Sequence, residues 1–181
     1  MDRLLELLTA HSFARKKVVL ASGRESDFFI DVKQTALLAE GHALIADAML
    51  AAIARLPERP RAVAGVELGG CPLASAVALR SFERGAPLDA IYVRKDVKDH
   101  GSRRALEGSS HLPAGASVVV LEDVITTAGS TLRAVERLRE HGFTVVGIVA
   151  VVDRREGGAA AIAETGIPFI AIYGREDFPG E

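Results

Sequence analysis

The fold is decided by the segment Val118–Leu138, VVVLEDVITTAGSTLRAVERL. It begins as an apolar strand, passes through two acids and a turn of small and hydroxyl residues, and continues as an amphipathic helix. Strands that are covered by helices on both faces of a sheet are continuously apolar, and this one is apolar up to Glu122. The segment is therefore one βα unit of an α/β fold.

The same alternation of apolar runs and helical segments continues along most of the chain. The strands of the predicted central sheet, five in number and parallel, are Ala62–Val66, Asp89–Arg94, Ser117–Leu121, Thr144–Val152 and Pro168–Ile172. The helices predicted to flank it are Ala36–Arg55, Pro72–Phe82, Ser130–His141 and Gly158–Glu164.

Residues 1–32 do not follow this alternation. A short amphipathic helix at Asp2–Ala10 precedes the extended stretch VVLASGRESDFFIDV at Val18–Val32, and we expect this region to form a small lid, or hood, over one end of the sheet. No linker separates it from the rest, so residues 1–181 are predicted to form one domain with a core at 33–181. Residues from about 95 to 115 form the longest irregular stretch, and loops of that length are usually functional or mobile.

Composition excludes several kinds of partner and site. Lys and Arg number 22 against 24 Asp and Glu, so no nucleic-acid partner is expected. No apolar run is long enough for a membrane span, and a cytoplasmic location is expected. The single cysteine, Cys71, excludes an internal disulfide, and its small apolar surroundings favour a packing role at a helix start over a nucleophilic one.

The turn after Asp123 is suited to a phosphate ester. First-turn N–H groups of a helix have no helical acceptor, and the helix dipole adds positive charge there. Thr126, Thr127 and Ser130 can add hydroxyl donors. Glu122 and Asp123 would repel a phosphate, so we expect them to face ribose hydroxyls and a bound Mg²⁺. A simple helix cap would explain one or two of these residues but not the whole run.

The turn contains neither GxxxxGK[ST] nor GxGxxG. It resembles instead the signature with which type I phosphoribosyltransferases bind 5-phosphoribosyl 1-diphosphate (PRPP). Further segments resemble the orotate branch of that family, and the resemblance extends from about Val18 to Gly158. These segments are SGRESDFFIDVKQ at Ser22–Gln34, GVELGGCPLA at Gly65–Ala74, YVRKDVKDHGSRRALEG at Tyr92–Gly108 and VVDRREGG at Val151–Gly158.

The resemblance implies the type I phosphoribosyltransferase fold and transfer of the 5-phosphoribosyl group from PRPP to N1 of orotate. It also implies Mg²⁺ dependence, with the ion held mainly by PRPP and water rather than by protein ligands, and a homodimer whose active sites are shared across the interface. Lys98, His100 and Asp123 are the implied catalytic residues. The residues implied to bind PRPP are Arg94, Lys95, Lys98, His100, Glu122, Asp123, Val124, Ile125, Thr126, Thr127, Ala128, Gly129 and Ser130.

The loop from Arg94 to Arg104 carries five Lys and Arg side chains against Asp96 and Asp99, a local net charge of +3 without His100. A loop with this charge could bind a diphosphate.

The residue expected to bind the acceptor is Arg154, which directly follows a predicted strand. A guanidinium matches the carboxylate by which orotate differs from uracil. Arg155 is the alternative candidate for binding this carboxylate.

The family also implies that Thr126, Phe28 and Phe29 contact the orotate, although one of the two aromatic residues is expected to face the core. Two positions depart from the family pattern, because Ala21 and Gly69 stand where many members carry lysine.

Two alternative functions of the protein stay open. One is a phosphoribosyltransferase for uracil or a purine, and the other is a non-catalytic nucleotide-sensing regulator on the same fold.

Overall fold

The apolar runs form one mixed sheet in the computed structural model, which describes residues 2–19, 25–95 and 105–179. The strand order is β5-β4-β3-β6-β7-β8. The five predicted parallel strands are confirmed as β3 (Ala62–Val66), β4 (Asp89–Val93), β6 (Ser117–Ile125), β7 (Thr144–Asp153) and β8 (Phe169–Gly174). The prediction missed β5 (Leu106–Glu107), which pairs antiparallel with β4 and is too short to give a periodic pattern.

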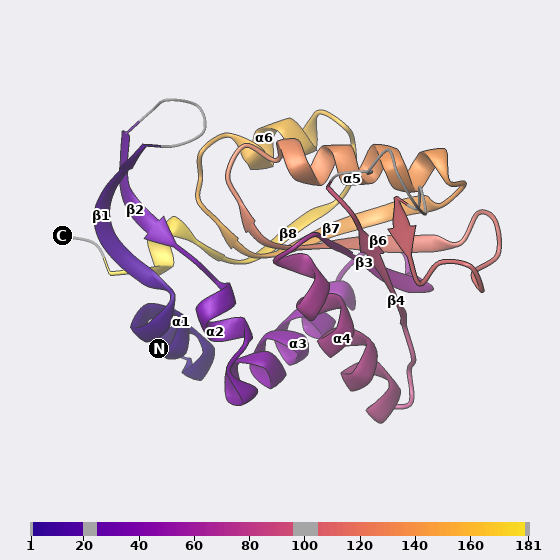
Figure 1. Cartoon of the computed structure of the whole chain (residues 1–181), viewed down its shortest axis with the longest axis horizontal. Helices are drawn as coiled ribbons and strands as arrows, with labels where there is room; N and C mark the ends of the chain where they lie inside the picture. The colour runs from indigo at the N-terminus through magenta and orange to yellow at the C-terminus, as the bar shows by residue number, and fades with distance from the viewer. Residues whose placement is uncertain (1, 20–24, 96–104, 180–181) are drawn as a thin grey trace, which may run out of the picture.

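Helices cover both faces of the sheet (Figure 1). Figure 1 shows α3 (Ala39–Ile53) and α4 (Gly70–Glu83) on one face, with α5 (Gly129–Glu140) and α6 (Gly158–Ala163) on the other. Side chains alternate along β6. Val119 and Leu121 pack with α3 and α4, whereas Val118 and Val120 pack with α5 and α6. All four side chains are fully buried, which is why the strand is apolar without interruption.

The predicted helix Ala36–Arg55 is wrong as a single element. The chain forms α2 (Lys33–Ala36) and then α3, with an extended backbone at Leu38 between them. Gly41 packs against the first helix so closely that a Cβ on it would lie 2.1 Å from the Thr35 carbonyl oxygen. The apolar pattern continues through this break and could not reveal it. In the described part of the chain, no helix combines the length and apolarity needed to cross a membrane.

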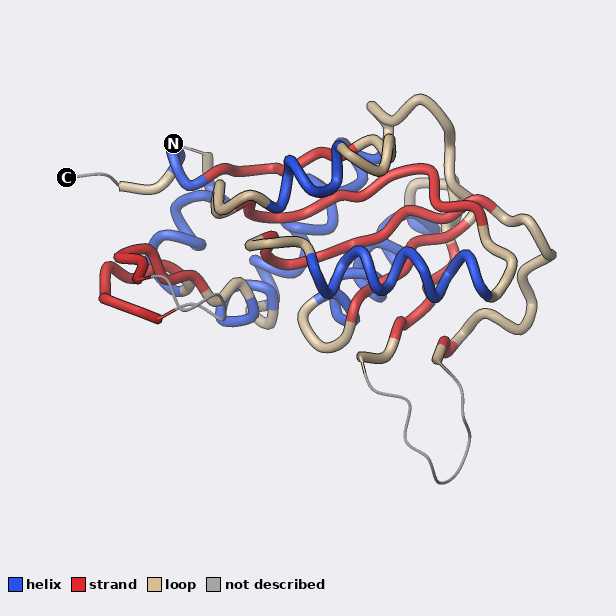
Figure 2. Tube along the Cα trace, turned by 90° about the horizontal axis from the view of Figure 1, so that it is seen from above, coloured by secondary structure: helices blue, strands red, loops and turns tan. Residues whose placement is uncertain are grey.

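The hood consists of α1 (Arg3–His11) and an antiparallel ribbon of β1 (Phe13–Val19) and β2 (Glu25–Ile30). Figures 1 and 2 show the ribbon at one end of the sheet. Asp2 caps α1 by accepting the Leu5 N–H at 2.9 Å, and it also accepts the Tyr173 hydroxyl of β8 at 2.8 Å. Because Leu8 joins the apolar cluster of α3 and α4, the hood and the sheet share one core.

The C-terminal segment packs against the hood. After β8 the chain forms the 3₁₀ helix η1 (Arg175–Asp177), and the buried ring of Phe178 follows. The ring centroid of Phe178 lies 5.4 Å from that of Phe13 and 5.5 Å from that of Phe28. The tail, to which the sequence analysis assigned no role, therefore supports the hood from the side of β8.

Candidate active site

The predicted phosphate turn and the predicted acceptor arginine lie together at the carboxyl edge of the sheet. Leu121 of β6 pairs with Gly65 of β3 and with Val149 of β7. The Arg154 N–H donates to the Ile125 carbonyl at 2.9 Å, which joins the ends of β7 and β6. Ligands bind at this edge in open α/β sheets, so the fold brings the two halves of the predicted site side by side.

The two acids of the turn face different environments. Glu122 is buried, and its Oε2 accepts the Thr131 hydroxyl at 3.0 Å. Asp123 is partly exposed, and its Oδ1 accepts the Val124 N–H at 2.9 Å. Burial and the neighbouring Asp123 raise the pKa of Glu122 to about 8. Glu122 is therefore largely protonated near neutral pH, which lessens the repulsion of a phosphate.

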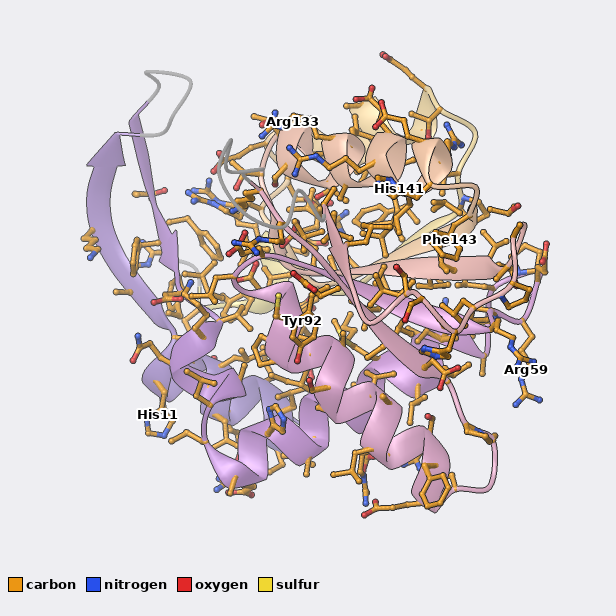
Figure 3. All side chains as sticks on the ribbon, turned by 45° about the vertical axis from the view of Figure 1, so that its right-hand side comes forward. His11, Arg59, Tyr92, Arg133, His141 and Phe143 are labelled. Carbon is orange, nitrogen blue, oxygen red and sulfur yellow. The ribbon has the colours of Figure 1, made fainter. Side chains whose placement is uncertain are left out.

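The turn from Thr126 to Ser130 leads into a helix whose first-turn N–H groups could bind an anion. Ala128 has a left-handed backbone with φ of 64°, and α5 begins at the next residue. The Leu132 N–H makes a helical bond to the Ala128 carbonyl at 2.9 Å, and the N–H groups before it lie in the first turn. The sequence analysis missed Arg133, whose Nη1 comes within 3.5 Å of where a Cβ on Gly129 would lie (Figure 3). Its guanidinium adds a cation at the start of the helix.

Gly158, the first residue of α6, contacts the backbone of the turn. Its N–H donates to the Thr126 carbonyl at 3.0 Å. A Cβ on Gly158 would lie 2.7 Å from the Thr126 carbonyl oxygen and 3.2 Å from the Ala128 nitrogen. Real Cβ atoms do not approach backbone so closely, so only glycine lets α6 hold the turn in this position.

The connection from β3 to α4 lies just as close to the end of β6. A Cβ on Gly70 would lie 2.5 Å from the Leu121 carbonyl oxygen, and one on Gly69 would lie 2.1 Å from Asp123 Oδ2. A larger side chain at position 69 would require the Asp123 carboxylate to turn aside. With glycine there, the position offers a diphosphate no cation, and contacts from this connection would come from backbone N–H groups.

A lysine that the sequence analysis did not identify stands nearby. Lys33, at the start of α2, places its Nζ 2.6 Å from Asp31 Oδ1 and 3.7 Å from Asp123 Oδ2. It lies in the segment Ser22–Gln34 that resembles the orotate branch, but the resemblance assigned it no role.

The base of the predicted loop is held by its neighbours. The Arg94 N–H donates to the Ala105 carbonyl at 3.0 Å, and the Lys95 N–H donates to Glu67 Oε2 at 2.9 Å. Arg137 of α5 donates to the carbonyls of Arg94 and Lys95, the latter at 2.8 Å. The helix that begins at the phosphate turn is thus tied to the loop. The predicted catalytic residues Lys98 and His100 lie outside the described residues, as does Ala21.

Arg154 lies between β7 and the hood. It is 8% exposed, and its Nη2 donates to the Phe28 carbonyl at 2.6 Å and pairs with Glu156 Oε1 at 3.0 Å. The Phe28 ring packs among aromatic rings of the core, so Phe28 is the core-facing member of the predicted pair. Phe29 is partly exposed, with Lys16 Nζ 3.7 Å from its ring centroid.

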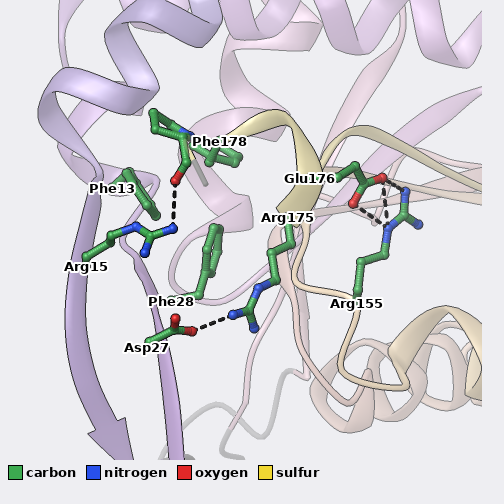
Figure 4. Close-up of a pocket in the computed structure, with 9 residues that line it drawn as sticks. Phe13, Arg15, Asp27, Phe28, Arg155, Arg175, Glu176 and Phe178 are labelled. Atoms are coloured by element: carbon green, nitrogen blue, oxygen red, sulfur yellow. Dashed lines mark hydrogen bonds and ion pairs between the residues drawn. The ribbon is translucent and has the colours of Figure 1, made fainter. Parts of the chain in front are cut away.

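Arg155 faces a different pocket, of about 380 Å³, between the hood and the tail (Figure 4). Its guanidinium pairs with Asp153 at 2.9 Å and with Glu176 at 2.5 Å. The other arginines of this pocket are also engaged, Arg175 by Asp27 and Arg15 by a backbone carbonyl of the tail. Arg154, whose N–H joins the ends of β7 and β6, is therefore better placed than Arg155 to meet an acceptor at that edge.

Cys71 lies at the start of α4 and is partly buried. Burial, followed by the charges of Glu67 and Glu122, raises the pKa of its thiol to about 11. A thiol that stays protonated at neutral pH is a poor nucleophile, in agreement with a packing role.

Within residues 2–19, 25–95 and 105–179, no three His, Cys, Asp or Glu side chains gather as a metal site. Asp123 is the acid of the turn that remains partly exposed. Its carboxylate suits ribose hydroxyls or the water shell of a cation whose other ligands come from the substrate.

Comparison with known proteins places this geometry in a family. Residues 33–165 match the family model described as the phosphoribosyl transferase domain. The chain is 64% identical over 177 residues to the orotate phosphoribosyltransferase of Sorangium cellulosum, covering 98% of this chain and 92% of that protein. The orotate phosphoribosyltransferase of Mycobacterium tuberculosis is similar in structure. Its complex with Fe(III) dicitrate has a TM-score of 0.80 at 37% identity, covering 96% of this chain and 95% of that one. Its complex with PRPP has a TM-score of 0.78 at 35% identity, again covering 96% of this chain and 95% of that one.

We expect Glu122→Gln to make the stability of the protein less dependent on pH. A carboxyl whose pKa is raised by folding stabilises the native state below its unfolded pKa, and this contribution is lost as the pH rises through about 8. Glutamine has no proton to lose. Melting temperatures between about pH 5 and about pH 9 should fall less steeply for the variant than for the wild type. Glu136→Gln, at an exposed position of α5, is the control. Parallel curves for wild type and Glu122→Gln would contradict the buried, protonated state of Glu122.

Proposed function

The chain belongs to the phosphoribosyltransferase family and to its orotate branch, and from this membership we propose how its residues divide the reaction between them. The reaction joins C1′ of PRPP to N1 of orotate and releases diphosphate. Its product, orotidine 5′-monophosphate, serves pyrimidine biosynthesis. The cytoplasmic location expected from the sequence stays a prediction.

The turn from Val124 to Ser130 takes the donor. We assign its first-turn N–H groups, with the hydroxyls of Thr126, Thr127 and Ser130, to the 5-phosphate of PRPP. Asp123 is the carboxylate placed to accept hydrogen bonds from the ribose hydroxyls, because Glu122 is turned inward onto Thr131. The relative from M. tuberculosis that binds PRPP supports this assignment.

The observation that carries the acceptor assignment is the burial of Arg154 beside the backbone of β2. A guanidinium presents its N–H donors as a planar fork, which suits the orotate carboxylate. In a largely buried site a charge-assisted pairing of this kind is strong. Thr126 lies at the start of the neighbouring turn, and Phe29 offers a partly exposed ring from the hood. Uracil and the purines lack the carboxylate that this arrangement recognises.

The site promotes the reaction mainly by stabilising the charges that develop in the transition state. As the diphosphate leaves, positive charge develops on the ribose ring and negative charge grows on the departing oxygens. The basic loop, with Arg94, Lys95, Lys98 and His100, is assigned to the departing diphosphate, and its closure would keep water from hydrolysing the donor. Mg²⁺ bound to PRPP would add positive charge to the leaving group. Asp123 is the described residue that fits its water shell.

We also propose a homodimer that forms through α4 and the elements beside it. In the described ranges, the exposed large apolar side chains all belong to α4, to the connection before it or to the connection between α2 and α3. They are Leu37, Leu38, Leu68, Leu79 and Phe82. Leu79 and Phe82 are 61% and 72% exposed and lie on one face of α4, because they are three positions apart. Exposed apolar surface of this kind marks interfaces. Tyr92, whose hydroxyl bonds that of Ser75, lies beside the same helix (Figure 3).

The acceptor assignment predicts that the wild type consumes orotate in the presence of PRPP and Mg²⁺ and leaves uracil and hypoxanthine unchanged. Replacement Arg154→Ala should lower kcat/KM for orotate by about 10²-fold or more, since a charged partner of the carboxylate is lost. The affinity for PRPP should change little. An ultraviolet assay of each base measures turnover. Arg155→Ala is the matched control and should keep most of the activity with orotate. Turnover with another base, or a larger loss in the control, would refute the assignment.

The interface proposal predicts that Leu79→Glu converts the protein to monomers, because a charge would be buried in an apolar contact. Sedimentation of the purified protein measures this directly. Arg59→Glu also changes an exposed side chain, at the edge of the molecule shown in Figure 3, and should leave the dimer intact. A monomeric wild type, or a dimeric Leu79→Glu variant, would contradict the proposed surface.

A further inference from the structure

The connection between β3 and α4 places a glycine, not a cation, next to Asp123. A Cβ on Gly69 would lie 2.1 Å from Asp123 Oδ2, 2.3 Å from its Cγ and 2.6 Å from Oδ1. A side chain at this position would require the Asp123 carboxylate to turn aside. With glycine there, a fixed cation beside Asp123 comes from another part of the chain.

Lys33 reaches this place from the hood side. Its Nζ is 2.6 Å from Asp31 Oδ1 and 3.7 Å from Asp123 Oδ2. Asp31 also accepts the Lys33 N–H at 3.3 Å and the Gln34 side-chain amide at 3.1 Å. These bonds hold the start of α2 and restrict the lysine side chain. The ammonium is thus placed between an anchoring acid and the acid of the donor turn.

The orientation of Asp123 fits this arrangement. Its Oδ1 accepts the Val124 N–H at 2.9 Å, while Oδ2 points to Lys33. Among the ion pairs of the described residues, Asp123 takes part in one, with Lys33. The hydrogen bond to Asp31, with the charge of Asp123, raises the pKa of Lys33, so the ammonium stays charged. The side chain of Asp123 is 16% exposed, so the pair is partly shielded from solvent.

We propose that Lys33 is a positioning residue of the donor site, which fixes the Asp123 carboxylate toward PRPP. This inference rests on the assignment of PRPP to the turn after Asp123. Through Asp31, which anchors Lys33, the hood then has a part in donor binding in addition to its contact with the acceptor arginine.

The test compares steady-state kinetics of the full-length Lys33→Ala and Lys33→Arg variants with the wild type. Lys33→Ala should raise KM for PRPP by about tenfold, the effect of losing a charge-assisted contact, while KM for orotate stays within about threefold. Lys33→Arg should restore most of the loss, because a guanidinium can span the same two acids. Arg3→Ala is the control, because it removes an exposed ion pair of similar geometry, with Glu40, away from the turn.

Asp123→Asn separates positioning from a general loss of structure. If Lys33 acts through Asp123, Lys33→Ala should add little to KM for PRPP when Asp123 is already asparagine. Melting temperatures confirm that each variant is folded. The inference is overturned if Lys33→Ala leaves KM for PRPP unchanged, if both KM values rise together, or if the two substitutions add fully. A wild type that does not use orotate would instead refute the proposed function.

Discussion

The close approach of backbone to backbone at the carboxyl edge of the sheet is the constraint on which the site depends. The connection between β3 and α4 and the start of α6 both lie against the turn that leaves β6, and each contact is made at a glycine. A Cβ on Gly70 would meet the carbonyl of Leu121, and one on Gly158 would meet the carbonyl of Thr126. A parallel sheet covered on both faces provides this edge, and the glycines allow the turn to be held there by backbone alone.

Charge at this edge is divided so that an anionic donor can bind beside two acids. Burial keeps Glu122 protonated near neutral pH, and Asp123 faces the ammonium of Lys33. The acceptor side depends on a contact over a long sequence separation, since Arg154 donates to the Phe28 carbonyl, 126 positions away. The hood thus touches both halves of the site. Phe178 and the tail hold the hood in place, which gives the end of the chain a structural part in the site.

The sequence predicted the elements whose patterns are long and local. The continuously apolar strands follow from burial on both faces, and the turn after Asp123 is one uninterrupted segment. The elements that it missed depend on tertiary contacts. The break before α3 arises from the packing of Gly41 on Thr35, and β5 is two residues long. Lys33 and Arg133 lie in segments that the sequence singled out, but only their positions in the structure mark them as candidate site residues. The choice between Arg154 and Arg155 required their positions, since Arg155 lines the pocket beside the tail and Arg154 bonds to the end of β6.

The most direct test of this account is the affinity of the Gly158→Ala variant for PRPP, measured by titration calorimetry with Mg²⁺. The added methyl would lie 2.7 Å from the Thr126 carbonyl oxygen and must displace the turn. We predict that PRPP binding weakens by about tenfold to a hundredfold, since small displacements of binding groups are costly. Ala160→Gly, at an exposed position of the same helix, should keep the wild-type affinity. Wild-type affinity in Gly158→Ala would contradict the claim that backbone contact at this glycine positions the donor site.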